Sequence, residues 1–152
     1  MEITNQIQTH SLNHLLHDED YCRRVIPYLK KEYFEGPHKT VFDLIVSFVH
    51  KHNKLPTGKV LELELQKLNA HEEIINSAGQ LIQELKTKSD LDTEYLINET
   101  EKWCKERSVY LAIMESINII DGKDKEKTEG AIPEILSNAL GTSFDQNIGH
   151  DY

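Results

Sequence analysis

The feature that most constrains the fold is a stretch of about 30 residues, 92–121, that is typical of one continuous helix. It is far longer than the average helix of a small domain. Its first half is polar, whereas its second half is apolar on nearly every side, with Val109, Tyr110, Leu111, Ala112, Ile113, Met114, Ile117, Ile119 and Ile120. A helix that is apolar all round must be covered all round. Because one neighbouring segment of the chain covers only one face, the sequence predicts a second subunit on the other.

The charge of the chain argues against bulk nucleic-acid binding. Its 152 residues suffice for one domain with a buried core, and 17 Lys and Arg against 26 Asp and Glu give a net charge of −9. A local basic patch is left open, with Arg23, Arg24, Lys30 and Lys31 as candidates. We find no signal-peptide pattern and no apolar run of membrane-spanning length, so we expect a cytoplasmic protein without membrane contact.

Five segments in residues 1–87 carry apolar residues at helical spacing, which predicts a globular multi-helix head. Asp18 and Thr57 are the expected N-caps of the second and fourth helices, and Pro37 suits the start of the third. Residues 60–65, VLELEL, alternate and could form a strand, but their composition favours a helix and no partner strand is evident. The sequence therefore predicts an all-α fold.

A hairpin of two helices is expected in residues 88–141. Gly122 ends the long helix, a polar loop follows, and Pro133 opens a shorter helix with one apolar side. Residues 142–152 have no helical period. We expect the hairpin to mediate oligomerisation through Trp103, Tyr110, Leu111, Met114, Ile117, Ile120, Ile132, Ile135 and Leu136. For Trp103, packing within the chain is an equal alternative.

The sequence offers little catalytic chemistry. His10, His14 and His17 share one helix face and could bind a metal ion. A metal site would need further ligands, which the sequence does not clearly supply. We therefore prefer a solvated helix face to the alternative of a metal-dependent enzyme. Cys22 and Cys104 are expected to be reduced core thiols. The chain contains no GxxxxGK[ST] phosphate-binding motif. We therefore expect no catalytic, cofactor or metal site in this chain, which by itself is not expected to be an enzyme.

Four segments carry a resemblance to a known family. They are VIPYLKKEYFEG at 25–36, VFDLIVSFVHKHNKLPT at 41–57, ETEKW at 99–103 and GAIPEILSNALGTSFDQNIGHDY at 130–152. Through them the chain resembles the N-terminal domain of DnaB-type replicative DNA helicases, most of all those of T4-like bacteriophages. In that family a helical head precedes a long helical hairpin, and paired hairpins join six N-terminal domains into a collar above the motor ring.

The resemblance implies a role in replication. The chain would hold subunits together as a dimer or hexamer and dock primase and a helicase loader. Residues 142–152 would begin a linker to an ATPase domain that is absent here and that carries the Walker motifs, ATP, Mg²⁺ and the DNA contacts. The parent would be an ATP-dependent helicase that moves 5′ to 3′ in the bacterial host cytoplasm. The alternative is a free-standing helical adaptor or phage regulator that binds a host protein through the same hairpin.

Overall fold

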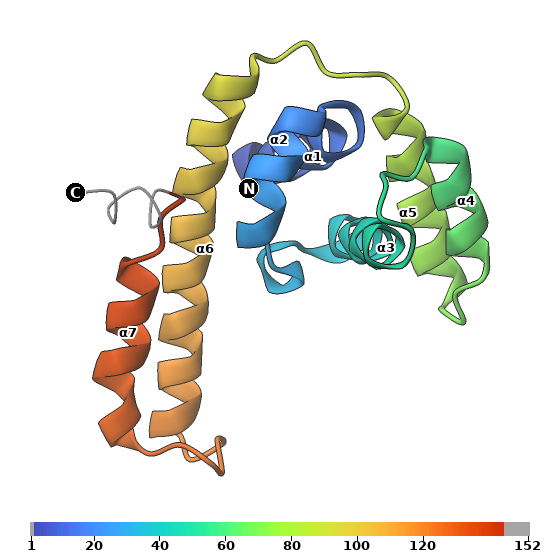
Figure 1. The fold of residues 1–152 in the computed structure, drawn as a ribbon. Coiled ribbons are helices and arrows are strands. Elements are labelled where there is room, and N and C mark those ends of the chain that lie inside the picture. The colour runs from blue at the N-terminus through green and yellow to red at the C-terminus, as the bar shows by residue number, and fades with distance from the viewer. Residues whose placement is uncertain (1, 145–152) are drawn as a thin grey trace. The chain divides into compact units, whose positions relative to one another are not determined.

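A computed structural model describes residues 2–144, and all regular structure in that range is helical, which confirms the predicted all-α fold (Figure 1). Contacts divide the chain into two units, Met1–Glu99 and Thr100–Tyr152, that meet inside one long helix. In chain order, with η for short 3₁₀ helices, the elements are α1 (Glu2–His17), α2 (Glu19–Val25), η1 (Ile26–Tyr28), η2 (Lys31–Tyr33), α3 (Gly36–His52), α4 (Gly58–Gln66), α5 (Glu72–Leu85), α6 (Thr93–Ile120), η3 (Glu129–Ala131) and α7 (Ile132–Leu140).

Local sequence signals set the helix ends in the first unit. Asp18 Oδ1 accepts a hydrogen bond from the Tyr21 N–H at 3.1 Å and so caps α2. Thr57 Oγ1 accepts from the Val60 N–H at 3.2 Å and caps α4. Pro37 lies in the first turn of α3. These three predicted helix starts are confirmed.

The core of the first unit is built around α3, which contacts α1, α4 and α5. Val41 and Ile45 of α3 are fully buried, and the rings of Phe34 and Phe42 stack with their centroids 4.6 Å apart. Residues 60–65 lie within α4, so the alternative of a strand is wrong.

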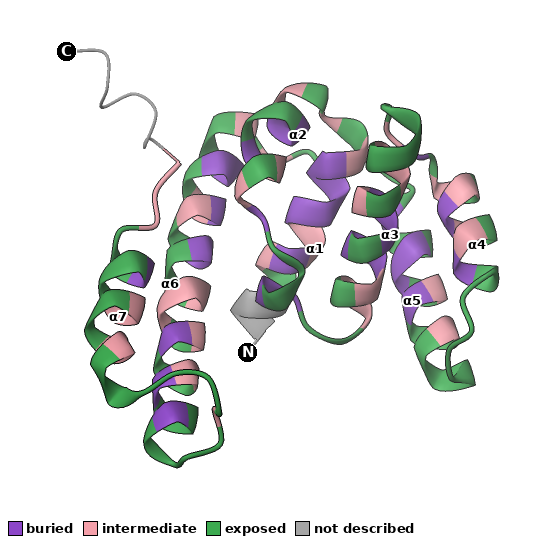
Figure 2. Cartoon of the chain, turned by 60° about the horizontal axis from the view of Figure 1, so that its bottom comes forward, coloured by how far each residue is buried: buried purple, intermediate pink, exposed green. Residues whose placement is uncertain are grey.

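In the second unit α6 and α7 run side by side in opposite directions as the predicted hairpin (Figures 1 and 2). Gly122, with φ at +76°, ends α6, and the following Lys123 N–H donates to the carbonyl of Asn118 at 2.9 Å. At the other end of the hairpin the Phe144 N–H donates to Glu101 Oε2 at 2.8 Å. Within residues 2–144, none of the helices combines the length and apolar character of a membrane span.

Candidate subunit interface

The buried face of α6 in the second unit carries mostly small side chains. Ala112, Ser116 and Ile119 are buried and follow one another at spacings of four and three residues, so they share one face. Ala139 of α7 is also buried. We assign these residues to the seam between α6 and α7, because these are the neighbouring helices of this unit (Figure 2). Apart from Ile119, these are small side chains, and five large apolar side chains of α6 lie outside the seam.

The larger apolar side chains form an exposed row on α6, which we call the α6 stripe and which consists of Tyr110, Ile113, Met114, Ile117 and Ile120. Each is between 41% and 64% exposed. At 100° per residue these positions fall on one side of the helix. Apolar side chains scattered singly on a surface need no explanation, whereas a contiguous row of five is a candidate contact site.

Charged side chains bound the α6 stripe. Glu106, four residues before Tyr110, and Asp121, directly after the last residue of α6, are both exposed and lie beyond the two ends of the stripe. The guanidinium of Arg107 lies 4.9 Å from the ring centroid of Tyr110, a cation–π contact. An apolar centre with a charged rim is the usual anatomy of a protein–protein interface.

The nine predicted interface residues do not all lie on this surface. Tyr110, Met114, Ile117 and Ile120 lie on the stripe, whereas Leu111, Ile132, Ile135 and Leu136 are partly buried. Trp103 is 4% exposed, so its indole offers a partner little surface. Two further large apolar side chains are exposed, Ile113 on the α6 stripe and Leu140 on α7. The sequence did not single them out, because periodicity does not tell which face of a helix its neighbour covers. That these residues meet a second subunit stays a prediction.

The histidine face of α1 is only partly solvated, whereas the sequence predicts a solvated face; His17 is exposed and His10 is half-buried. His14 is 1% exposed. His10 Nδ1 lies 3.2 Å from Ser89 Oγ, and His17 Nε2 donates to the Leu85 carbonyl at 2.7 Å. The polar side of α1 therefore contacts other parts of the first unit, although His17 at its end is also exposed to water. Over the described residues 2–144, no three His, Cys, Asp or Glu side chains cluster closely enough to hold a metal ion.

The candidate basic patch is partly neutralised. Arg23 and Arg24 donate to the carboxylate of Asp20 at 2.9 and 3.3 Å, and Arg24 also pairs with Glu94. Two of its four positive charges thus have acidic partners. This pairing weakens the case for phosphate recognition at this surface.

Both cysteines are buried free thiols, as the sequence predicts. Burial raises the pKa of Cys104 to about 12, and burial also raises the pKa of Cys22. Because the thiolate is the nucleophile, neither group is activated for covalent chemistry near neutral pH.

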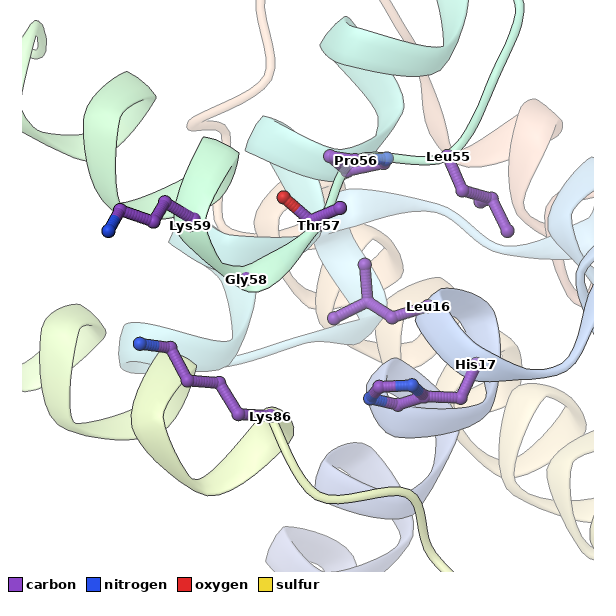
Figure 3. Close-up of a pocket in the computed structure, with 8 residues that line it drawn as sticks. All are labelled: Leu16, His17, Leu55, Pro56, Thr57, Gly58, Lys59 and Lys86. Atoms are coloured by element: carbon purple, nitrogen blue, oxygen red, sulfur yellow. The ribbon is translucent and has the colours of Figure 1, made fainter.

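Open cavities lie in the first unit, and two of them are lined partly by η1 and α3 or by α1 and α4. One, of about 510 Å³, lies where Leu16 and His17 of α1 face the start of α4 and Lys86 (Figure 3). A Cβ on Gly58 would come within 2.9 Å of Lys86 Cγ, so glycine makes room for that side chain. Lys86 Nζ pairs with Glu62 Oε1 at 3.1 Å, which compensates its charge. The other cavity, of about 620 Å³, lies between η1 and α3. The predicted absence of a catalytic site stays a prediction.

Comparison with known proteins agrees with the sequence motifs. No family model matches the chain. The chain is 35% identical, over 150 aligned residues, to the DnaB-like replicative helicase of Enterobacteria phage T4. The match covers 93% of this chain but only 31% of that helicase, so the chain spans about a third of its relative. The predicted resemblance is thereby confirmed: the chain is similar, over nearly its whole length, to one part of a DnaB-like replicative helicase of a bacteriophage.

Proposed function

We propose that this chain is the N-terminal collar domain of a phage replicative DNA helicase, and that it holds the subunits of the helicase together. The similarity to about a third of a replicative helicase supports the assignment to that enzyme. The observation that supports the assembly role is the α6 stripe, five large apolar side chains that are exposed on one side of the hairpin.

The chemistry of the α6 stripe favours a second copy of the chain as its occupant. In a two-fold symmetric pair, the stripe of one copy packs against the stripe of the other copy, so each covers the apolar surface of its partner. Burial of apolar surface stabilises association by about 25 cal/mol per Å². A stable interface buries roughly 1,600 Å² in total, more than the stripes alone provide, so the partly buried residues at the edge of the hairpin join the contact.

The proposal extends to the parent protein and its partners. The parent would be an ATP-dependent DNA helicase of the host cytoplasm, with ATP and Mg²⁺ bound in a motor domain outside this chain and with DNA contacted through that domain. The collar would also dock primase and a helicase loader. Titration of the purified domain with the cognate primase tests the docking role, and the absence of a detectable complex would count against it.

The assembly role is tested by placing a charge in the α6 stripe. We expect Met114→Asp to weaken self-association about 100-fold or more, because an unpaired carboxylate would be desolvated in the contact. Sedimentation velocity over a dilution series measures the change. Asn118→Asp is the matched control, since it adds the same charge at an exposed polar position of the same helix.

The outcome decides between the proposal and its main alternative. Equal association of the Met114→Asp and Asn118→Asp variants would rule out the stripe as the contact. A free-standing adaptor that binds a host protein would instead give a monomer with an open reading frame lacking a downstream GxxxxGK[ST] motif. Sequencing the gene beyond the codon of residue 152 separates the two directly.

A further inference from the structure

A single asparagine of α1 holds the segment that connects α5 to α6, residues 86–92, which we call the connector. Asn13 Nδ2 donates to the carbonyl of Thr87 at 2.7 Å, and Asn13 Oδ1 accepts from the N–H of Ser89, also at 2.7 Å. Asn13 is only 5% exposed, so both bonds are shielded from water. One side chain thus satisfies a donor and an acceptor of a connector backbone that lacks helical partners.

Neighbouring groups extend this attachment. His17 Nε2 donates to the Leu85 carbonyl at 2.7 Å, just before the connector begins. His10 Nδ1 lies 3.2 Å from Ser89 Oγ, and that hydroxyl oxygen accepts from the Leu91 N–H at 3.3 Å. Residues 10, 13 and 17 are three and four positions apart and so share one side of α1. The polar side of α1 therefore follows the backbone of the connector from its start to its middle.

Buried apolar side chains hold the chain before and after the connector, but no residue of the connector itself is buried. Leu85 at the end of α5 and Leu96 in α6 are each 1% exposed. Between them, every residue of the connector is exposed or partly exposed. The connector is thus held by hydrogen bonds between two segments that are held by the core.

We propose that the connector is a releasable strap, which opens as one cooperative segment while the helices on both sides stay packed, with Asn13 as its latch. Segments with few buried apolar contacts open at a lower free energy than the whole domain unfolds. Opening uncovers the polar side of α1 without disturbing Leu85 or Leu96. The inference rests on contacts within the first unit and does not depend on the proposed function.

Amide hydrogen exchange of the full wild-type chain, followed residue by residue by NMR, tests the strap. We expect the Ser89 and Leu91 amides to exchange with the same opening free energy, and faster than the amide of Ile45 in the buried part of α3. The proposal is overturned if the two amides exchange at the rate of Ile45, as in global unfolding, or with clearly different opening free energies.

A latch variant provides the second test. We expect Asn13→Ala to speed exchange at Leu91 about tenfold or more, the change expected from losing one or two hydrogen bonds of ordinary net strength. Leu91 decides the matter because its N–H bonds to Ser89 and not to Asn13. Asn76→Ala, at an exposed position of α5, is the control and should leave both amides unchanged. Faster exchange at Ser89 alone, with no change at Leu91, would contradict the proposal that the connector opens as one segment. If the variant does not fold, the exchange measurement on the wild-type chain still tests the proposal.

Discussion

The two units differ in where many of their large apolar side chains lie. In the first unit Tyr21 and Phe34 are buried, and the helices pack around α3. In the second unit Trp103 and Ile119 are buried, but Tyr110 and its neighbours on the α6 stripe are exposed. The first unit therefore carries its own core, whereas the hairpin leaves much of its apolar surface exposed. This difference agrees with the proposed assembly role of the hairpin.

The largest expected effect tests the core of the first unit. Phe34→Ala should lower the free energy of unfolding by about 3–5 kcal/mol, because it removes a buried ring stacked on Phe42 and leaves a cavity. Urea denaturation followed by circular dichroism measures it. Tyr110→Ala, which removes an aromatic ring from the α6 stripe, should change the stability of dilute protein by less than about 0.5 kcal/mol. Equal losses for the two variants would contradict the division into a folding and an assembly role.

The next effect tests the seam of the hairpin. Ala112→Leu should destabilise the chain by about 1–3 kcal/mol, because Ala112 is buried and a larger side chain has to displace its neighbours. Ile113→Leu, one position along and exposed, is the matched control and should be close to neutral. Thermal melting of the two variants gives the difference. A neutral Ala112→Leu variant would mean that α7 does not cover this face of α6.

A pH-dependent effect is expected at Asp18 in the first unit. Burial raises the pKa of this carboxyl group, but hydrogen bonds from Thr93, the Tyr21 N–H and His14 outweigh burial and hold the pKa below its ordinary value. The carboxylate therefore stabilises the fold above the unfolded-state pKa, and that contribution is lost as the pH falls through the lowered folded-state pKa.

Asp18→Asn removes this titration while keeping an oxygen that can cap α2. We expect the wild type to be more stable than the variant at neutral pH and the gap to shrink below about pH 4. Urea titrations at several pH values measure the gap. A gap that does not change between pH 6 and pH 2.5 would show that the charge of Asp18 contributes nothing.

The smallest effect concerns an exposed leucine of the first unit. Leu63 of α4 is 60% exposed, yet it does not belong to a row like the α6 stripe. Leu63→Ser should change neither stability nor self-association by more than about 0.5 kcal/mol, since isolated exposed apolar residues are normal. A clear loss of association in sedimentation experiments would place a second contact surface on the first unit.

Signals that act within one turn of helix were predictable from the sequence. The stretch that predicts the long helix begins at Asp92, and Asp92 Oδ2 accepts from the Tyr95 N–H at 2.9 Å. Gly122 was expected to end that helix and does so with a left-handed φ of +76°. Such caps depend on neighbours in the sequence, so a single sequence contains the information.

Contacts between distant segments were not predictable. The polar face of α1 looked solvated because its residues are hydrophilic, yet Asn13 and His17 bond to backbone atoms 68 or more residues away. Likewise, the sequence showed that α6 is apolar all round but not which side α7 covers, so Ile113 was missed. The spacing of apolar residues shows that a helix has an apolar face, but it does not show which other segment packs against that face.

The mass of the wild-type chain in solution tests the central claim most directly. Light scattering over a dilution series should show an average mass that rises with concentration from 17.6 kDa toward that of two or more copies. The Asn118→Asp variant should behave like the wild type, and Met114→Asp should remain monomeric. A wild-type mass of 17.6 kDa at every concentration would contradict the account, because the α6 stripe would then remain exposed without a second copy to cover it.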